Sequence, residues 1–142
     1  MRRGEIVSAA RLWLGTPYRH QAATLRAGCD CLGLLRGVWR TLYGGEPLAL
    51  PNYRADWRDA RHAGELQAAA ERLLARRDGQ MRAGQVVLFR LGHSPLPRHC
   101  GVMVSDSRFI HAQERLGVVE AHLSEGWRRR IAGQYDFPGV EF

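Results

Sequence analysis

The sequence predicts a single α+β domain in which N-terminal helices pack on one side of a C-terminal antiparallel sheet. The first half of the chain carries apolar residues at helical spacing, whereas the second half carries short β-rich runs separated by turn residues. Helices followed by strands are typical of the α+β class. A chain of 142 residues has the length of one ordinary domain, so we expect residues 1–142 to form one domain with its own core.

Helical spacing marks two of the helices expected in the first half. Residues 3–14 carry apolar side chains at positions 6, 9, 10, 13 and 14, and the run GTP at 15–17 ends this helix. A longer helix is expected over residues 56–77, which are rich in Ala and Arg and have one apolar face. Two loops connect the helices, residues 16–29 and 46–55.

A further helix, expected over residues 31–43, begins at a cysteine. Its apolar positions 31, 34, 35, 38, 39 and 42 form one continuous stripe, as expected for a helix packed on a core. Asp30 is a suitable N-cap because its carboxylate can accept hydrogen bonds from the free amides of the first turn. Gly44 and Gly45 provide the terminator.

The second half of the chain alternates between β-rich runs and turn residues. Four strands are expected: QVVLF (85–89), HCGVMVS (99–105), RFIHA (108–112) and GVVEA (117–121). A short helix near 124–131 and a last strand near 135–137 complete the prediction.

Composition limits the partners and the cell compartment. The net charge is +7 and all 21 basic residues are Arg, which favours an anionic partner such as a cell-wall polymer. These residues are scattered apart from the run 128–130, so we expect no specific nucleic-acid binding. No stretch approaches the ~20 apolar residues that a membrane span needs. Glu5 and Arg11 interrupt the N-terminal apolar run, so we expect synthesis in the bacterial cytoplasm without a signal peptide.

Three cysteines, an odd number, do not form a disulfide framework, and Cys31 is the candidate nucleophile among them. A thiolate is the reactive form, and the free amides at a helix start lower a thiol pKa by only about one unit. A histidine partner must therefore supply the remaining shift. Cys29 lies in the preceding loop, outside the field of the helix. The alternative for either thiol is a small buried apolar side chain.

Two of the six histidines, His99 and His111, lie in strands of one expected hairpin. A three-residue loop at 105–107 pairs Val104 with Arg108 and therefore Gly101 with His111, which puts both imidazoles on one face of the sheet. We then expect His99 to be the base and His111 to orient it. A two-residue loop at 106–107 would separate them, and His111 would then be a half-buried core residue.

An ordered set of motifs resembles the NlpC-type cell-wall peptidases (NlpC/p-sixty), a family of papain-like cysteine peptidases. The motifs are GTPY (15–18), DCLGLL (30–35), AGQVVLF (83–89), HCGVMV (99–104) and FIHA (109–112). The resemblance implies a peptidoglycan endopeptidase that needs no cofactor and cleaves stem peptides, often between D-glutamate and the following diamino acid. It assigns Cys31 as nucleophile, His99 as base and His111 as third member of the triad.

The same resemblance places Tyr18 in the substrate and oxyanion pocket, where the alternative is simple packing beside Pro17. We expect Asp30, Gly33 and His20 around the same pocket. His20 lies in the loop just before the cysteines, and its alternative is a plain surface role.

The sequence departs from the family pattern in three places, and these departures concern the wall of that pocket. Leu32 follows the nucleophile where the family has Ser, Gln85 replaces an acid, and the Trp-Gly-Gly that often follows the tyrosine is absent.

The motif GCDCLGL resembles a compact subgroup carried by phages and gene-transfer particles. This resemblance implies a tail-tip or baseplate partner and action in the periplasm or cell wall.

Three other functions remain open at this point. Cys29, Cys31, His99 and Cys100 provide enough ligands for a tetrahedral zinc, although neighbouring strand residues 99 and 100 point to opposite faces. A tail component with a decayed site would need no reactive thiol. A muramoyl–alanine amidase would keep the triad and change only the bond.

Overall fold

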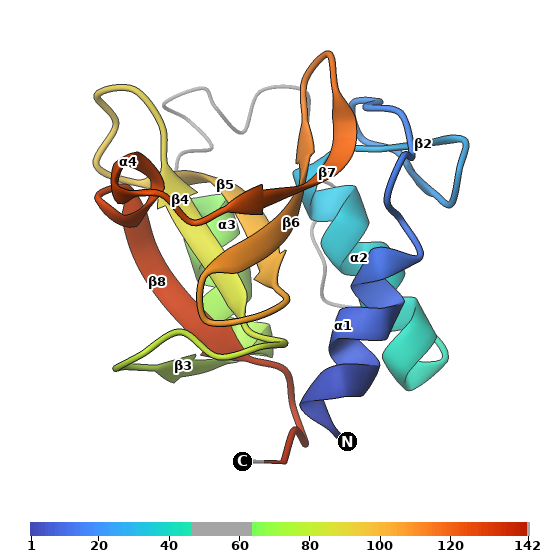
Figure 1. Cartoon of the computed structure of the whole chain (residues 1–142), viewed down its shortest axis with the longest axis horizontal. Coiled ribbons are helices and arrows are strands. Elements are labelled where there is room, and N and C mark those ends of the chain that lie inside the picture. Colours follow the sequence, from blue (N-terminus) through green and yellow to red (C-terminus); the bar gives the residue numbers. More distant parts are fainter. Residues whose placement is uncertain (47–63, 142) are drawn as a thin grey trace.

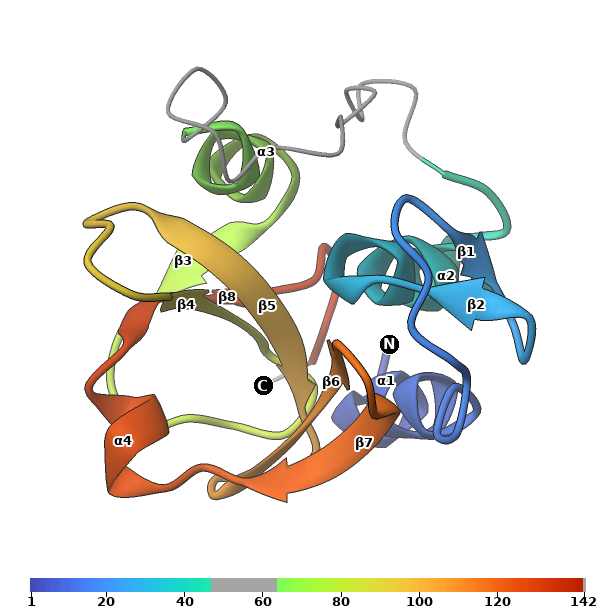
Figure 2. The same cartoon turned by 90° about the horizontal axis from the view of Figure 1, so that it is seen from above.

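The computed structural model describes residues 1–46 and 64–141. A six-stranded antiparallel sheet has the order β3-β8-β4-β5-β6-β7 and curls on itself, with α1 and α2 beside it (Figures 1 and 2). The elements are α1 (Arg3–Arg11), β1 (Ala23–Thr24), β2 (Gly28–Cys29), α2 (Cys31–Tyr43), α3 (Glu65–Leu73), β3 (Ala75–Arg77), β4 (Val86–Arg90), β5 (Pro97–Met103), β6 (Arg108–Gln113), β7 (Gly117–His122), α4 (Glu125–Arg128) and β8 (Ile131–Asp136). This is the expected α+β architecture.

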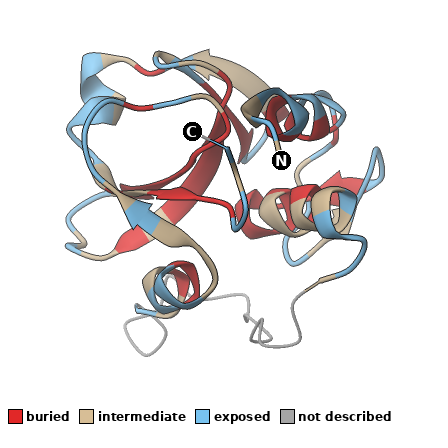
Figure 3. Cartoon of the chain, turned by 90° about the horizontal axis from the view of Figure 1, so that it is seen from below, coloured by how far each residue is buried: buried red, intermediate tan, exposed pale blue. Residues whose placement is uncertain are grey.

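The two faces of the curled sheet bury different sets of side chains, because successive strand residues point to opposite faces. The outer face packs on α1, α2 and α3 and forms the main core, to which Leu88, Val102 and Ile110 contribute. The inner face carries an aromatic cluster centred on Phe89 and Phe109. Figure 3 shows the buried residues of the helices turned toward the sheet.

Helix α2 has the expected bounds, and both of its caps are as predicted. Asp30 has an extended backbone and its side chain accepts a hydrogen bond from the Gly33 amide. Gly44 ends the helix with φ of 80°, a left-handed conformation that glycine adopts without strain. Helix α1 ends at Arg11, earlier than expected, but Trp13 in the following turn is still buried.

The prediction of a third helix over residues 56–77 is wrong at its C-terminal end. Helix α3 ends at Leu73, and residues 75–77 form strand β3, which pairs with β8. Arg77 donates to the carboxylate of Asp136 across this pair at 3.1 Å, an interaction between distant segments that overrides the local helical preference. The part of that prediction over residues 56–63, and most of the preceding loop, lie outside the described residues.

The β5–β6 hairpin has the predicted register. Val102 pairs with Ile110, and the Val104 amide donates to the Arg108 carbonyl at 2.9 Å, so the loop has three residues. The same register places Gly101 opposite His111. A Cβ atom on Gly101 would lie 2.8 Å from the Ile110 oxygen and 3.3 Å from Cβ of His111, so a residue without a side chain is needed here.

The strand predictions are confirmed with small shifts, and β8 starts earlier than expected, at Ile131, because it pairs with both β3 and β4. The loop over 16–29 contains the short strands β1 and β2. Within the described residues, no helix has the length and apolar character needed to cross a bilayer.

Contact between α1 and α2 depends on Gly37. A Cβ atom there would lie 1.9 Å from Cζ2 of the buried Trp13 ring. A Cβ atom on Gly4, in the exposed part of α1, would have no atom within 4 Å. We expect Gly37→Ala to lower the free energy of unfolding by about 1–3 kcal/mol, despite the better helix propensity of Ala, because the ring must move.

Urea denaturation checks this prediction, with Gly4→Ala as the matched control. The control should leave stability unchanged or raise it by up to about 1 kcal/mol. Equal behaviour of the two variants would contradict the packing that we describe.

Candidate active site

The first residue of α2, Cys31, is buried with 5% of its surface exposed. The Asp30 carboxylate fixes this helix start: Oδ1 accepts from the Gly33 amide at 2.7 Å, and Oδ2 accepts from the Gln21 amide at 2.8 Å. One buried carboxylate therefore ties the helix to the preceding loop and sets the position of the Cys31 sulfur.

The loop before the cysteines packs directly on this first turn. A Cβ atom on Gly33 would lie 1.8 Å from the Ala22 carbonyl oxygen, so only glycine allows this approach. His20 lies at the exposed rim, with Nδ1 3.9 Å from Oδ2 of Asp30. Asp30 and Gly33 thus build the wall beside Cys31, while His20 is at its edge.

Tyr18 and Cys29 come together just before the helix start. Tyr18 forms an isolated parallel bridge with Cys29, and its half-buried side chain packs on the core cluster that contains Cys31. Cys29 is fully buried, and burial followed by the charge of Asp30 raises its pKa to about 12. Cys29 therefore stays a neutral thiol at pH 7.

The two hairpin histidines form a direct pair. His99 Nε2 lies 2.7 Å from His111 Nδ1, with the ring planes at 76°. Both rings are buried, and His111 has 1% of its surface exposed. Burial, followed by the charge of His99, lowers the pKa of His111 to about 3, so His111 is neutral at pH 7.

His99 also interacts with Cys31, since it is one of the groups that lower the pKa of this thiol. Because Nε2 of His99 is engaged by His111, Nδ1 is the nitrogen that remains for an interaction with the sulfur. The pKa of Cys31 is lowered from 9.0 to about 6. A hydrogen bond from Cys100 is the largest cause, and that from His99 adds to it, while burial and the charge of Asp30 oppose both.

Trp127 completes the enclosure of the histidine pair, and sequence reasoning did not identify it. Its ring stacks on His99 at 5.8 Å and meets His111 edge-on at 5.3 Å, while Arg130 covers it at 5.5 Å. Trp127 lies on the four-residue α4, far from His99 in the sequence. No local pattern marked it as part of the site.

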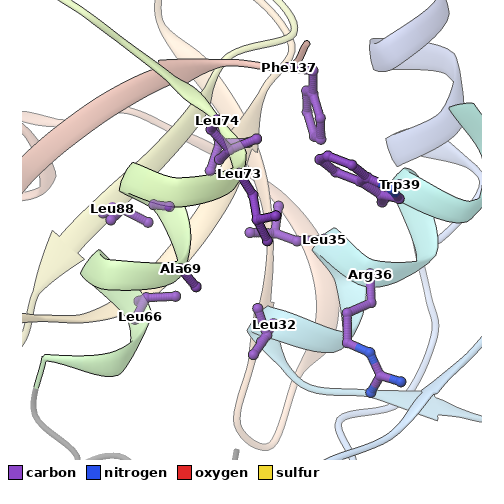
Figure 4. A pocket seen from close by; sticks show the side chains of 12 residues that line it. Leu32, Leu35, Arg36, Trp39, Leu66, Ala69, Leu73, Leu74, Leu88 and Phe137 are labelled. Carbon is purple, nitrogen blue, oxygen red and sulfur yellow. The ribbon is translucent and has the colours of Figure 1, made fainter. Parts of the chain in front are cut away.

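Leu32, which stands where the resemblance expects Ser, is buried. It lines an apolar pocket between α2 and α3, together with Leu35 and Leu66 (Figure 4). Gln85 is buried, and its Oε1 accepts from the Arg82 amide at 3.0 Å within the turn before β4. Both departures thus occupy structural positions.

Among residues 1–46 and 64–141, no three His, Cys, Asp or Glu side chains are grouped so that they could hold a metal ion.

A cysteine at a helix start that faces an imidazole pair on an antiparallel sheet defines the papain-like class of α+β domains. Within that class, the chain belongs to the NlpC/P60 family, whose pattern matches residues 15–135.

Characterised relatives resemble the chain over most of its length. It is 29% identical over 119 residues to murein DD-endopeptidase MepS/murein LD-carboxypeptidase of Escherichia coli K12, covering 83% of this chain and 54% of the relative. It is 27% identical over 129 residues to gamma-DL-glutamyl hydrolase of Bacillus subtilis, covering 90% and 28%. The chain thus spans about half the length, or less, of these relatives.

Solved structures share the fold. The NlpC/p60 domain of the peptidoglycan hydrolase SagA superposes with a TM-score of 0.67 at 17% identity, covering 96% of this chain and 100% of that domain. An NLP/P60 family protein similar to a lipoprotein, from Staphylococcus aureus, has a TM-score of 0.65 at 19% identity, with 99% and 42% covered.

The three thiols should differ sharply in reactivity. With its pKa at about 6, Cys31 is mostly thiolate at pH 7. Burial raises the pKa of Cys29, and the interaction with Cys31, followed by burial, raises that of Cys100, so both stay protonated. We expect iodoacetamide to label Cys31 alone at pH 7, with the labelling rate falling about tenfold by pH 5.

Peptide mass spectrometry measures labelling at each cysteine. Cys31→Ala, which should take up no label at pH 7, is the control. Similar labelling of all three thiols would contradict the site geometry.

Proposed function

We propose that the protein is a cysteine endopeptidase that cleaves peptidoglycan stem peptides through a Cys31 thioester. The observation that carries this proposal is the continuous chain of contacts from Cys31 through His99 to His111. A lowered thiol pKa and a neutral imidazole behind the base are the electrostatic state that acyl transfer requires.

The reaction begins when the Cys31 thiolate attacks the stem-peptide carbonyl. The Cys31 amide, at the first position of α2, cannot be bonded by a carbonyl of its own helix and is suited to donate to the oxyanion. His99 in its protonated form gives its proton to the leaving amine and then activates the water that releases the product. His111 holds Nε2 of His99, so that Nδ1 stays directed at the sulfur.

For the scissile bond we propose the one between D-glutamate and the diamino acid. The name of the B. subtilis relative, gamma-DL-glutamyl hydrolase, supports this choice, whereas the name of the E. coli relative indicates a DD bond. A muramoyl–alanine amidase would use the same three residues, so the products must distinguish these bonds. The net charge of +7 favours an anionic wall as the surface on which the enzyme acts.

Digestion of purified peptidoglycan tests the function. We expect the wild type to release fragments that end in D-glutamate, and Cys31→Ala to release none. His99→Ala should lower the rate by about 10²-fold or more because it removes the acid–base group. His111→Asn should retain more activity than His99→Ala because it removes only the orienting ring.

Mass spectrometry of the fragments identifies the bond. The control is His122→Gln, an exposed histidine at the end of β7, which should digest as the wild type does. Absence of fragments that depend on Cys31 from several wall types would favour a tail component with a decayed site.

We further propose that the enzyme reaches the wall as part of a phage-like particle, at the tail tip. This proposal is supported only by the resemblance of GCDCLGL to the particle-borne subgroup. Proteomics of particles purified from the source bacterium should find the chain enriched with tail proteins. A chain present in the cell envelope but absent from such particles would contradict it.

A further inference from the structure

Arg98 lies directly before His99 on β5, and it is the extra residue of a β-bulge. Phe89 on β4 pairs with His99. The next β4 residue, Arg90, pairs with Pro97, so Arg98 has no partner residue on β4. Bulges bend a strand, redirect a side chain and are common next to active sites. The register of the sheet therefore sets Arg98 apart, one residue from the proposed base.

The side chain of Arg98 is half-buried and has an unsatisfied donor. Its Nε atom is buried and has no hydrogen-bond partner. Among residues 1–46 and 64–141, no carboxylate forms an ion pair with this guanidinium group. A cation that is partly removed from water without an anionic partner is unfavourable, so a bound anion would stabilise it.

Other arginines that the fold partly buries are supplied with a carboxylate. In the described part of the chain, only one other buried side-chain nitrogen or oxygen lacks a hydrogen-bond partner, Nε of Arg3. The terminal nitrogens of Arg3, however, donate to Asp136 at 3.0 and 3.3 Å. Arg36 likewise pairs with Glu46 at 2.8 Å. Arg98 differs from both because the fold provides no carboxylate for it.

A stem peptide offers carboxylates close to the proposed scissile bond. A γ-linked D-glutamate keeps its α-carboxylate free, and only its own short side chain separates this group from the scissile carbonyl. A C-terminal diamino acid carries a second carboxylate, next to the amine that receives the proton from His99. A guanidinium group matches either one, since its planar fork donates two parallel hydrogen bonds to a carboxylate.

We propose that Arg98 binds a carboxylate of the stem peptide beside the scissile bond and so selects acidic over amidated stem peptides. This inference rests on the proposed function and adds a specificity-determining residue to it. The bulge before His99 gives Arg98 its place at the site, and the missing protein partner leaves its donors for the substrate.

The experiment measures the binding of four peptides to Cys31→Ala, which cannot cleave them, by isothermal titration calorimetry. The peptides are L-alanyl-γ-D-glutamyl-L-lysine and its three forms in which the glutamate carboxylate, the lysine carboxylate or both are carboxamides. We expect one of the two single amidations to weaken binding about tenfold or more, because charge-assisted hydrogen bonds are lost. The position of that amidation identifies which carboxylate Arg98 binds.

Arg98→Gln in the same Cys31→Ala background should bind the acidic peptide as weakly as the parent binds the amidated one. Arg98→Lys keeps the charge but not the fork, so it should retain part of the preference, and it also serves if Gln disturbs the fold.

Arg82→Gln is the matched control. Arg82 is exposed in the turn before β4, where the Gly84 amide donates to the carbonyl of Met103, at the opposite end of β5 from Arg98. The control removes the same charge and should keep the full preference for the acidic peptide.

Each outcome decides the proposal. A preference for one carboxylate that is lost in Arg98→Gln and kept in Arg82→Gln supports it. Equal binding of all four peptides, an equal loss for all four in Arg98→Gln, or no binding of any peptide overturns it. Cleavage is measured separately with Cys31 intact. Peptides that bind through Arg98 but are not cleaved would count against the proposed function and leave this inference standing.

Discussion

The arrangement of the site depends on the buried carboxylate of Asp30. Its two oxygens join the first turn of α2 to the loop at Gln21, and this tie fixes the position of the helix start relative to that loop. The same carboxylate opposes the reactive form of the thiol, because its negative charge raises the pKa of Cys31. Asp30 therefore positions the nucleophile but disfavours its thiolate form. Other groups must lower the pKa of Cys31.

Glycines allow the three segments of the site to meet at short range. Gly33 allows the loop to lie on α2, and Gly101 allows His111 to approach β5. Behind the histidines, Phe89, Phe109 and Trp127 restrict the rings and limit access of water. In this apolar setting the neutral form of His111 is the stable one, so it can serve as a fixed hydrogen-bond partner for His99 at pH 7.

The parts of the structure that depend on local sequence could be predicted. The apolar stripe and caps gave both ends of α2, and the three-residue turn fixed the register that pairs Gly101 with His111. Non-local contacts were missed. Strand β3 exists through its pairing with β8, although its Arg-rich sequence favours a helix. Trp127 joins the site only because α4 folds back over the histidines. Hydrophobic periodicity along the sequence does not predict a contact between segments so far apart.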